Sequence, residues 1–201
     1  MGGTVRIFYM NQSLAFILIS CTSFFVVSCS PTTDELYNTA YNLENEKKFK
    51  EAIEVYDKIL KRNRQFQDAY LGKGYCYQQD SNYTKALYFF EYTKSLKMKG
   101  AFIFEENANS PFASEEAKHQ VPIGRIHYQI AITKYYMDSL RSAYENFQTA
   151  IAHNYEIGNC YIWQGLIWMD HDSIQKGCDF FRKAMRVGET DASRFIKMYC
   201  R

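Results

Sequence analysis

Cysteine is the residue type in this sequence that is best placed to do chemistry, and its positions fall into two groups. Cys29 directly follows residues 13–28, an apolar segment without charge, so its thiol would be a nucleophile at a membrane surface. Beyond it, a thiol either packs as a small apolar group or forms a disulfide. The cysteines in that part of the chain are Cys76, Cys160, Cys178 and Cys200.

Residues 1–28 are predicted to be a secretion signal, with Arg6 before the apolar segment and small residues at its end. The apolar segment is shorter than the ~20 residues of a membrane-spanning helix. Val26-Val27-Ser28-Cys29 resembles the lipobox of bacterial lipoproteins. The resemblance implies lipidation of Cys29, cleavage before it, and a lipidated tether over residues 29–33.

Two alternatives to this lipid anchor stay open. Leu18-Ile19-Ser20-Cys21 is a rival lipobox, although it leaves only residues 14–19 as an apolar segment. The other alternative is an ordinary signal anchor. Ser30 follows Cys29, whereas enteric lipoproteins kept in the inner membrane have an aspartate there. By that analogy the expected location is the cell envelope, with the outer membrane favoured.

Other residues that could do chemistry do not form a motif. The sequence contains no Cys-x-x-Cys, no His-Glu-x-x-His and no glycine-rich phosphate loop. We therefore expect no catalytic residue, metal, cofactor or small-molecule substrate. The net charge of +2 comes from 24 basic and 22 acidic residues without a block of five like charges, so nucleic acid is not an expected partner.

A repeat with a period of about 34 residues is the pattern that must position these groups. Ala52 is matched one period later by Ala86, and Tyr56 is matched by Phe90. A fixed period of this length predicts stacked helical hairpins, in which small residues let helices approach and aromatic residues fill the remaining space.

The repeats resemble the tetratricopeptide repeat, a helix–turn–helix unit. The family pattern of large, small and aromatic positions is matched by Leu36, Ala40, Leu43, Ala52 and Tyr56, by Tyr70, Gly74, Tyr77, Ala86, Phe90 and Thr93, by Ala131, Tyr135, Ala143, Phe147 and Ala150, and by Tyr161, Gly165, Trp168, Gly177, Phe181 and Ala184. The turn of the third copy appears one residue short. The resemblance implies an all-α superhelical array of about four hairpins with a C-terminal capping helix.

The expected organisation places hairpins 1–2 in residues 34–98, an insertion in 99–124, hairpins 3–4 in 125–188 and the cap in 189–201. The insertion is either a lid over the hairpin stack or a loop specific to a partner. Cys178 begins a second helix, and Cys200 ends a cap that should fold back on it. This closing segment resembles that of some secreted repeat proteins of this type, which supports a disulfide between Cys178 and Cys200 as a hypothesis.

Asp138-Ser139-Leu140 and Asp172-Ser173-Ile174 fall at equivalent turns between helices. Side-chain capping of the following helix is the expected role of Asp or Ser there. The alternative is O-glycosylation, because the tripeptides resemble those that some Gram-negative lineages modify in exported proteins.

In tetratricopeptide proteins, ligands lie in a concave groove lined by the first helices. The matching positions here that we expect to bind a partner are Tyr37, Tyr41, Leu71, Tyr75, Gln78, Ile162 and Leu166. Further groove positions are Asp34, Glu44, Asn45, Asp68, Gln79, Asn159, Met169 and Asp170. The lysine and asparagine set that grips a peptide carboxylate in some members is missing.

The expected function is therefore a non-catalytic scaffold for a protein or peptide partner, attached to the membrane through its lipid anchor. It would belong to an envelope assembly or secretion complex. The alternative is a periplasmic, chaperone-like carrier that sheathes apolar segments of exported proteins.

Overall fold

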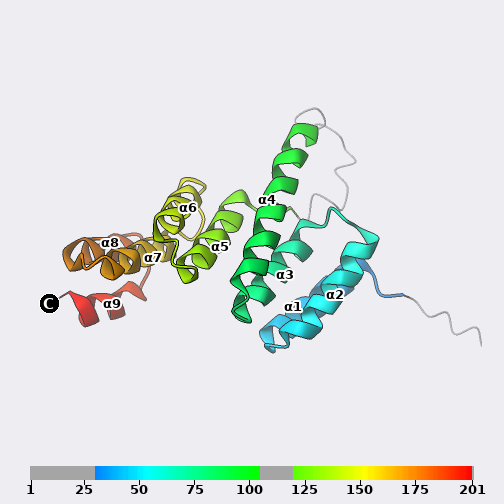
Figure 1. Cartoon of the computed structure of the whole chain (residues 1–201), viewed down its shortest axis with the longest axis horizontal. Coiled ribbons are helices and arrows are strands. Elements are labelled where there is room, and N and C mark those ends of the chain that lie inside the picture. The colour runs from blue at the N-terminus through cyan, green and yellow to red at the C-terminus, as the bar shows by residue number, and fades with distance from the viewer. Residues whose placement is uncertain (1–29, 105–119, 201) are drawn as a thin grey trace, which may run out of the picture. The chain divides into compact units, whose positions relative to one another are not determined.

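The computed structural model of the chain describes residues 30–104 and 120–200 (Figure 1). Pro31–Arg201 form one compact unit. In the described residues the unit contains nine helices and no strand. Their bounds are α1 Thr33–Asn45, α2 Phe49–Arg62, α3 Gln67–Gln79, α4 Tyr83–Phe104, α5 Ile123–Tyr136, α6 Leu140–Ala152, α7 Ile157–Asp170, α8 Ile174–Arg186 and α9 Ala192–Tyr199.

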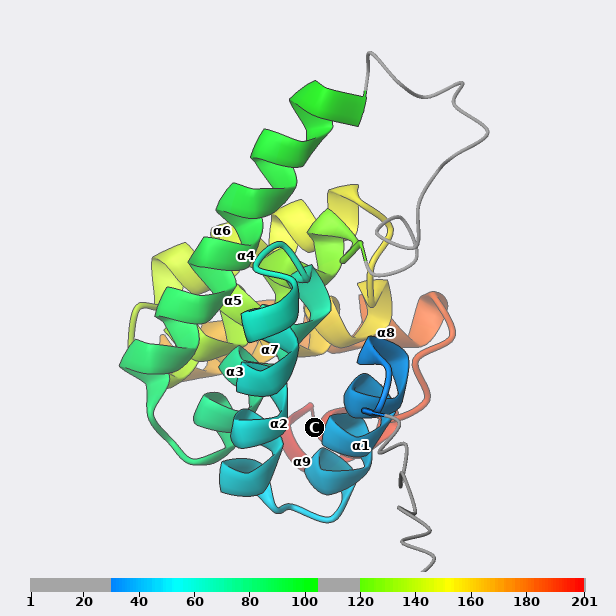
Figure 2. The same cartoon turned by 90° about the vertical axis from the view of Figure 1, so that its right-hand side faces the viewer.

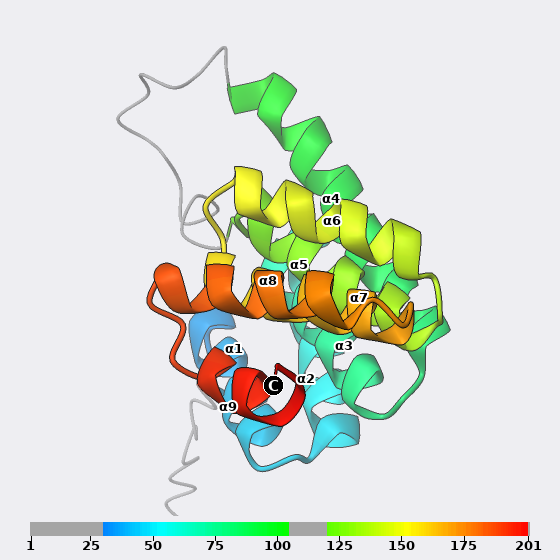
Figure 3. The same ribbon diagram turned by 90° about the vertical axis from the view of Figure 1, so that its left-hand side faces the viewer.

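The helices pair in chain order into four hairpins, α1–α2, α3–α4, α5–α6 and α7–α8, and each hairpin packs on the next. Figures 2 and 3 show the paired helices running side by side. The expected all-α array of four hairpins with a final helix is confirmed. The first helices also contact one another in sequence, α1 with α3, α3 with α5 and α5 with α7.

Small residues and aromatic rings fill the hairpin interiors as the repeat pattern predicts. Ala52, Ala86, Phe90, Phe147 and Phe181 are all fully buried. A Cβ added to Gly74 would lie 2.5 Å from the Phe90 ring, and one added to Gly165 would lie 2.5 Å from the Phe181 ring. The second and fourth hairpins therefore use the same close contact between a glycine and a ring.

All four hairpin turns share one conformation. The second residue after each first helix has a left-handed backbone, with φ of 60° at Lys47, 57° at Ser81, 57° at Asp138 and 53° at Asp172. Two backbone hydrogen bonds close each turn, for example from the Asp138 N–H to the Tyr135 carbonyl and from the Ser139 N–H to the Lys134 carbonyl.

This shared turn geometry corrects the expectation that the third turn is one residue short. The small-residue positions Ala131 and Gly165 are one full period apart. Lys134 thus occupies the position of Trp168, and Tyr135 lies one position later in the repeat. The expected side-chain capping is also absent, since neither Ser139 nor Ser173 makes a capping hydrogen bond.

The segment between hairpins 2 and 3 begins later than expected, because α4 continues without a break to Phe104. Its far end projects beyond the neighbouring helices in Figures 1 and 3. The chain returns to the stack at Val121, which is fully buried and whose N–H donates to Gln67 Oε1 at 3.3 Å. Residues 105–119 lie outside the described residues, so the lid and the partner loop both stay predictions.

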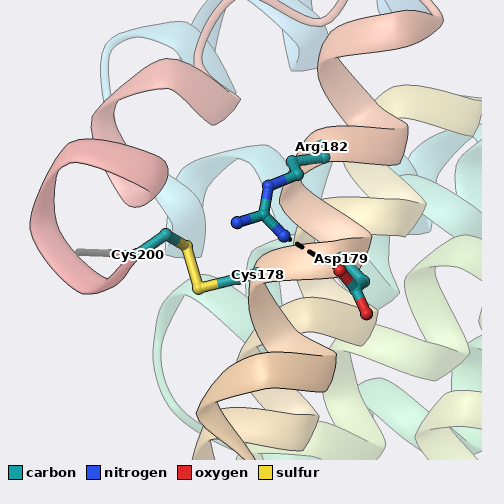
Figure 4. The surroundings of a disulfide bond; sticks show 4 residues. All are labelled: Cys178, Asp179, Arg182 and Cys200. Atoms are coloured by element: carbon teal, nitrogen blue, oxygen red, sulfur yellow. Dashed lines mark hydrogen bonds and ion pairs between the residues drawn. A yellow bond between two sulfur atoms is a disulfide. The ribbon is translucent and has the colours of Figure 1, made fainter.

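The C-terminal helix α9 covers the last hairpin. Cys178 of α8 and Cys200 are joined by a disulfide, with their Cα atoms 5.6 Å apart (Figure 4). The Phe195 ring stacks on Phe181 with centroids 5.2 Å apart. Ile196 packs on the same core, and the Tyr199 ring, although 42% exposed, stacks on Phe181 with centroids 6.4 Å apart.

Two predicted features of the N-terminus lie outside the described residues, namely the signal segment 1–28 and lipidation of Cys29. The tether residues Pro31 and Thr32 lead into α1, where Thr32 and Glu35 form a reciprocal cap. In the part of the chain that the structure describes, none of the helices has both the length and the apolar character needed to cross a bilayer.

Candidate partner-binding cleft

The first helices of hairpins 1, 2 and 3 enclose a cleft of about 220 Å³. Most of its lining residues come from α1, α3 and α5, while α2 contributes Tyr56 and the turn before α7 contributes Tyr155. The lining residues are Tyr37, Tyr41, Glu44, Asn45, Tyr56, Asp68, Leu71, Gly72, Tyr75, Arg125, Gln129 and Tyr155.

Four of the residues expected to bind a partner meet in this cleft. Tyr37 and Tyr41 come from α1, and Leu71 and Tyr75 come from α3. They meet because the first helices turn equivalent faces toward the cleft, and residues three or four positions apart lie on the same face of a helix. Tyr41 is 50% exposed at the rim, whereas Leu71 is 2% exposed and forms part of the floor.

Three expected residues lie elsewhere. Gln78 is buried, and its Nε2 donates to Thr133 Oγ1 at 2.9 Å and to the Gln129 carbonyl at 3.3 Å. Ile162 is buried in a core cluster that includes Ala192 of α9, and Leu166 packs against the same cluster. The structure thus places Gln78 and Ile162 in interfaces between helices, and Leu166 beside one, away from the cleft.

Residues that the sequence reasoning missed are Arg125, Gln129 and Tyr155. Arg125 lies one period before Asn159, so it occupies the repeat position of Asp34 and Asp68. The corrected turn register would have identified it. No comparable signal marks Tyr155, which reaches the cleft because glycine at position 124 lets its turn approach: a Cβ there would lie 2.6 Å from Tyr155 Cβ.

Glu44 places a partly buried carboxylate in the cleft. The Tyr56 hydroxyl donates to its Oε1 at 2.8 Å, and the Cys76 thiol lies 3.6 Å from the same atom. Burial raises the pKa of Glu44 above its ordinary value, and these two hydrogen bonds and the charge of Arg125 only partly oppose the shift.

Arg125 and Asp68 form an ion pair across α5 and α3, with Nη1 and Oδ1 3.6 Å apart. The Asp68 side chain is largely buried, whereas that of Arg125 is 38% exposed. Burial, with a smaller contribution from Asp68, raises the pKa of the neighbouring Tyr37 hydroxyl to about 12. The Tyr37 hydroxyl is therefore a neutral hydrogen-bonding group at physiological pH.

The arrangement around Cys76 does not favour thiol chemistry. Burial and the negative charge of Glu44 raise the pKa of this thiol well above its ordinary range. Because the thiolate is the reactive form, Cys76 is a buried packing residue that donates a weak hydrogen bond. Among the described residues no cluster of His, Cys, Asp and Glu could hold a metal ion.

A second hollow of about 360 Å³ lies over α6 and α7. It is lined by Leu140, Arg141, Tyr144, Glu145, Gln148, Ile167, Trp168 and His171. It contains none of the residues expected to bind a partner. We therefore take the cleft between α1, α3 and α5 as the candidate site.

The fold is shared with MamA. A crystal structure of MamA matches with a TM-score of 0.57 and 17% sequence identity, over 77% of this chain and 72% of MamA. The MamA RS-1 ArsTM double mutant matches with a TM-score of 0.56 and 19% identity, over 79% of this chain and 76% of that one. No family model and no curated protein matches the sequence. Identities this low show a common fold alone.

Proposed function

We propose that this protein is a non-catalytic scaffold that holds a segment of a protein partner in the cleft between α1, α3 and α5. The observation that carries the proposal is the meeting of Tyr37, Tyr41, Leu71 and Tyr75 from two repeats in one cleft. Tyrosine is enriched in protein interfaces, because it offers a large apolar ring and a polar tip at little conformational cost.

The location of this activity is proposed from the sequence. The apolar segment 13–28 and Val26-Val27-Ser28-Cys29 favour a lipid anchor at Cys29, in the cell envelope and on the outer membrane. Several acyl chains would hold the protein firmly, since one chain alone binds a bilayer only marginally. Attachment through the short tether 29–33 favours a partner that is itself in the envelope, such as a component of an assembly or secretion complex.

Cross-linking in cells tests the scaffold proposal. A tagged full-length protein is cross-linked, purified from membranes and compared with a Tyr41→Asp, Tyr75→Asp double variant. We expect one stoichiometric partner that the double variant loses, because two carboxylates would be forced into an aromatic cleft. Tyr88→Asp is the matched control, since Tyr88 is 63% exposed on α4 and does not line the cleft.

The other outcomes separate the competing functions. Many substoichiometric clients would support the chaperone-like carrier instead. A single partner retained equally by the double variant and the Tyr88→Asp control would contradict binding in the cleft.

A further inference from the structure

The cleft has the size of a site for one side chain. Its volume of about 220 Å³ is below the ~300–1,000 Å³ of sites for drug-sized ligands. A partner segment that crosses the first helices could therefore insert one long side chain between α1, α3 and α5. The chemistry of the cleft restricts which side chain that is.

The charges in the cleft leave one carboxylate without a cation. Two lining residues are acidic, Glu44 and Asp68, and one is basic, Arg125. Arg125 forms its ion pair with Asp68. Within the part of the chain that the structure describes, Glu44 accepts hydrogen bonds from neutral donors, Tyr56 and Cys76, and forms no ion pair.

One residue that lines the cleft, Gln129, also has an unsatisfied acceptor in its side chain. Gln129 Oε1 is buried and has no hydrogen-bond partner among the described residues. A buried acceptor without a donor is unfavourable, so such atoms are uncommon in folded proteins. A rotation of the Gln129 side chain would present this atom to a donor that enters the cleft from a partner.

The walls of the cleft suit a cation as well. Tyr37, Tyr41, Tyr75 and Tyr155 are among the residues that line it. The face of an aromatic ring attracts an ammonium or guanidinium group, and the attraction grows when water is excluded.

We propose that the cleft receives a lysine or arginine side chain of the partner segment, whose cationic head pairs with Glu44 and donates to Gln129 Oε1. This inference rests on the proposed function and names the chemistry that its cleft recognises. An acidic side chain or a carboxyl terminus is the opposite possibility, with Arg125 as its partner. Glu44 would repel such a group, and Asp68 would compete with it for Arg125.

A displayed library of random dodecapeptides, selected on the purified full-length protein in detergent, tests the inference. We expect the enriched peptides to share one lysine or arginine position next to apolar or aromatic residues. Replacing that residue by norleucine, or by citrulline for arginine, keeps its length and removes its charge. This change should weaken binding about tenfold or more, equivalent to ~1.4 kcal/mol.

Protein variants complete the test. Glu44→Gln should weaken the basic peptide about tenfold, but should not weaken its uncharged counterpart, because the lost charge pair is then already absent. Gln129→Met removes the side-chain amide, both its acceptor and its donors, and provides a second variant if Glu44→Gln folds poorly. Glu54→Gln, an exposed carboxylate on α2, is the control and should bind both peptides unchanged.

Three results in which peptides are enriched would overturn the inference. They are enriched peptides without a basic position, enriched peptides that require a carboxylate, and equal binding of the basic peptide by wild type and by both cleft variants. In each of these cases peptides still bind, so the scaffold function survives. Failure of any peptide to be enriched would also overturn the inference. The scaffold function itself would then be judged by the cross-linking experiment, in which the Tyr41→Asp, Tyr75→Asp variant is expected to lose the partner.

Discussion

At the scale of single residues, Glu44 is a charged side chain at a position where burial favours an uncharged one. It occupies the same repeat position as Gln78, Tyr135 and Met169. Gln78 is neutral and buried against α5, whereas Glu44 keeps a carboxylate in a place where burial raises its pKa. A buried carboxylate without a cation is unfavourable for folding, so its presence favours a role in binding.

We expect Glu44→Gln to raise the free energy of unfolding at pH 7. A raised pKa means that the folded state binds the proton more tightly than the unfolded state, so stability falls as pH rises through the interval between the two pKa values. Below the unfolded pKa, at about pH 3.5, both states are protonated and the difference from wild type should disappear. Urea unfolding at both pH values measures this.

Glu54→Gln is again the control, since the carboxylate of Glu54 is exposed. This variant should have the same urea midpoint as wild type at both pH values. A lower midpoint for Glu44→Gln at pH 7 would show that the charge-assisted hydrogen bond from Tyr56 outweighs the burial of the carboxylate.

At the scale of helices and hairpins, the packing of hairpin 4 depends on how closely the backbones of α7 and α8 approach each other. A Cβ on Gly165 of α7 would lie 2.5 Å from the Phe181 ring and 3.1 Å from the Gly177 carbonyl oxygen of α8. The ring and the facing backbone cannot both retreat, because Phe181 is itself held between α7 and α9. The helices of this hairpin therefore require a residue without a side chain at position 165.

Gly165→Ala should destabilise the protein by about 1–3 kcal/mol, because the added methyl group overpacks the helix crossing. This loss should appear even though alanine favours helix more than glycine does. Thermal unfolding followed by circular dichroism measures it. Gln175→Ala, exposed on α8, should remain within ~0.5 kcal/mol of wild type. Equal melting temperatures for the two variants would contradict the described crossing.

The cap α9 is short, and a covalent bond holds it to the hairpin that it covers. The disulfide closes 22 residues between Cys178 and Cys200. A loop of that length restricts the unfolded chain enough to contribute on the order of 3 kcal/mol. Cys178 is buried beside Phe181, and the ion pair of Arg182 with Asp179 lies on the exposed side of the same helix (Figure 4).

Removing the disulfide should lower stability by on the order of 3 kcal/mol. The Cys178→Ser, Cys200→Ser double variant should melt at a lower temperature than wild type. A reductant should lower the melting temperature of the wild type toward that of the variant. The double variant should not respond to the reductant. A wild type that melts equally with and without reductant would contradict a stabilising bond.

At the scale of the whole molecule, a repeat array contributes a surface, and the proposed lipid anchor would determine where that surface is displayed. The body carries its own core clusters from hairpin 1 to the cap. Stability of such an array is close to a sum of the hairpins and their neighbour contacts. Loss of the anchor should therefore move the protein without unfolding it.

Cys29→Ser should release the protein from the membrane fraction, because the hydroxyl cannot accept the lipid that the proposed anchor requires. Cell fractionation shows the redistribution, and intact mass of the purified wild type shows the acyl groups. Cys21→Ser, at the rival lipobox, should leave the protein in membranes. Release by Cys21→Ser instead would move the lipidation site to that residue.

The sequence by itself determined the hairpin array. The fixed repeat period and the alternation of small and aromatic residues are local patterns, and they predict which face of each helix is buried. The same periodicity placed Tyr37, Tyr41, Leu71 and Tyr75 on one surface. The leader motif at Cys29 likewise depends only on neighbouring residues and stays a prediction.

Only the tertiary structure decided which of the equivalent groove positions line the cleft. Tyr37, Leu71 and Ile162 share one repeat position, yet Tyr37 and Leu71 line the cleft, whereas Ile162 lies in the core that α9 completes. The ion pair of Arg125 with Asp68 joins residues on either side of the segment that interrupts the repeats. Helix α4 continues to Phe104, although the repeat pattern predicted that hairpin 2 ends at residue 98. Burial depends on the neighbouring element as well as on the residue, so a repeat position alone cannot determine it.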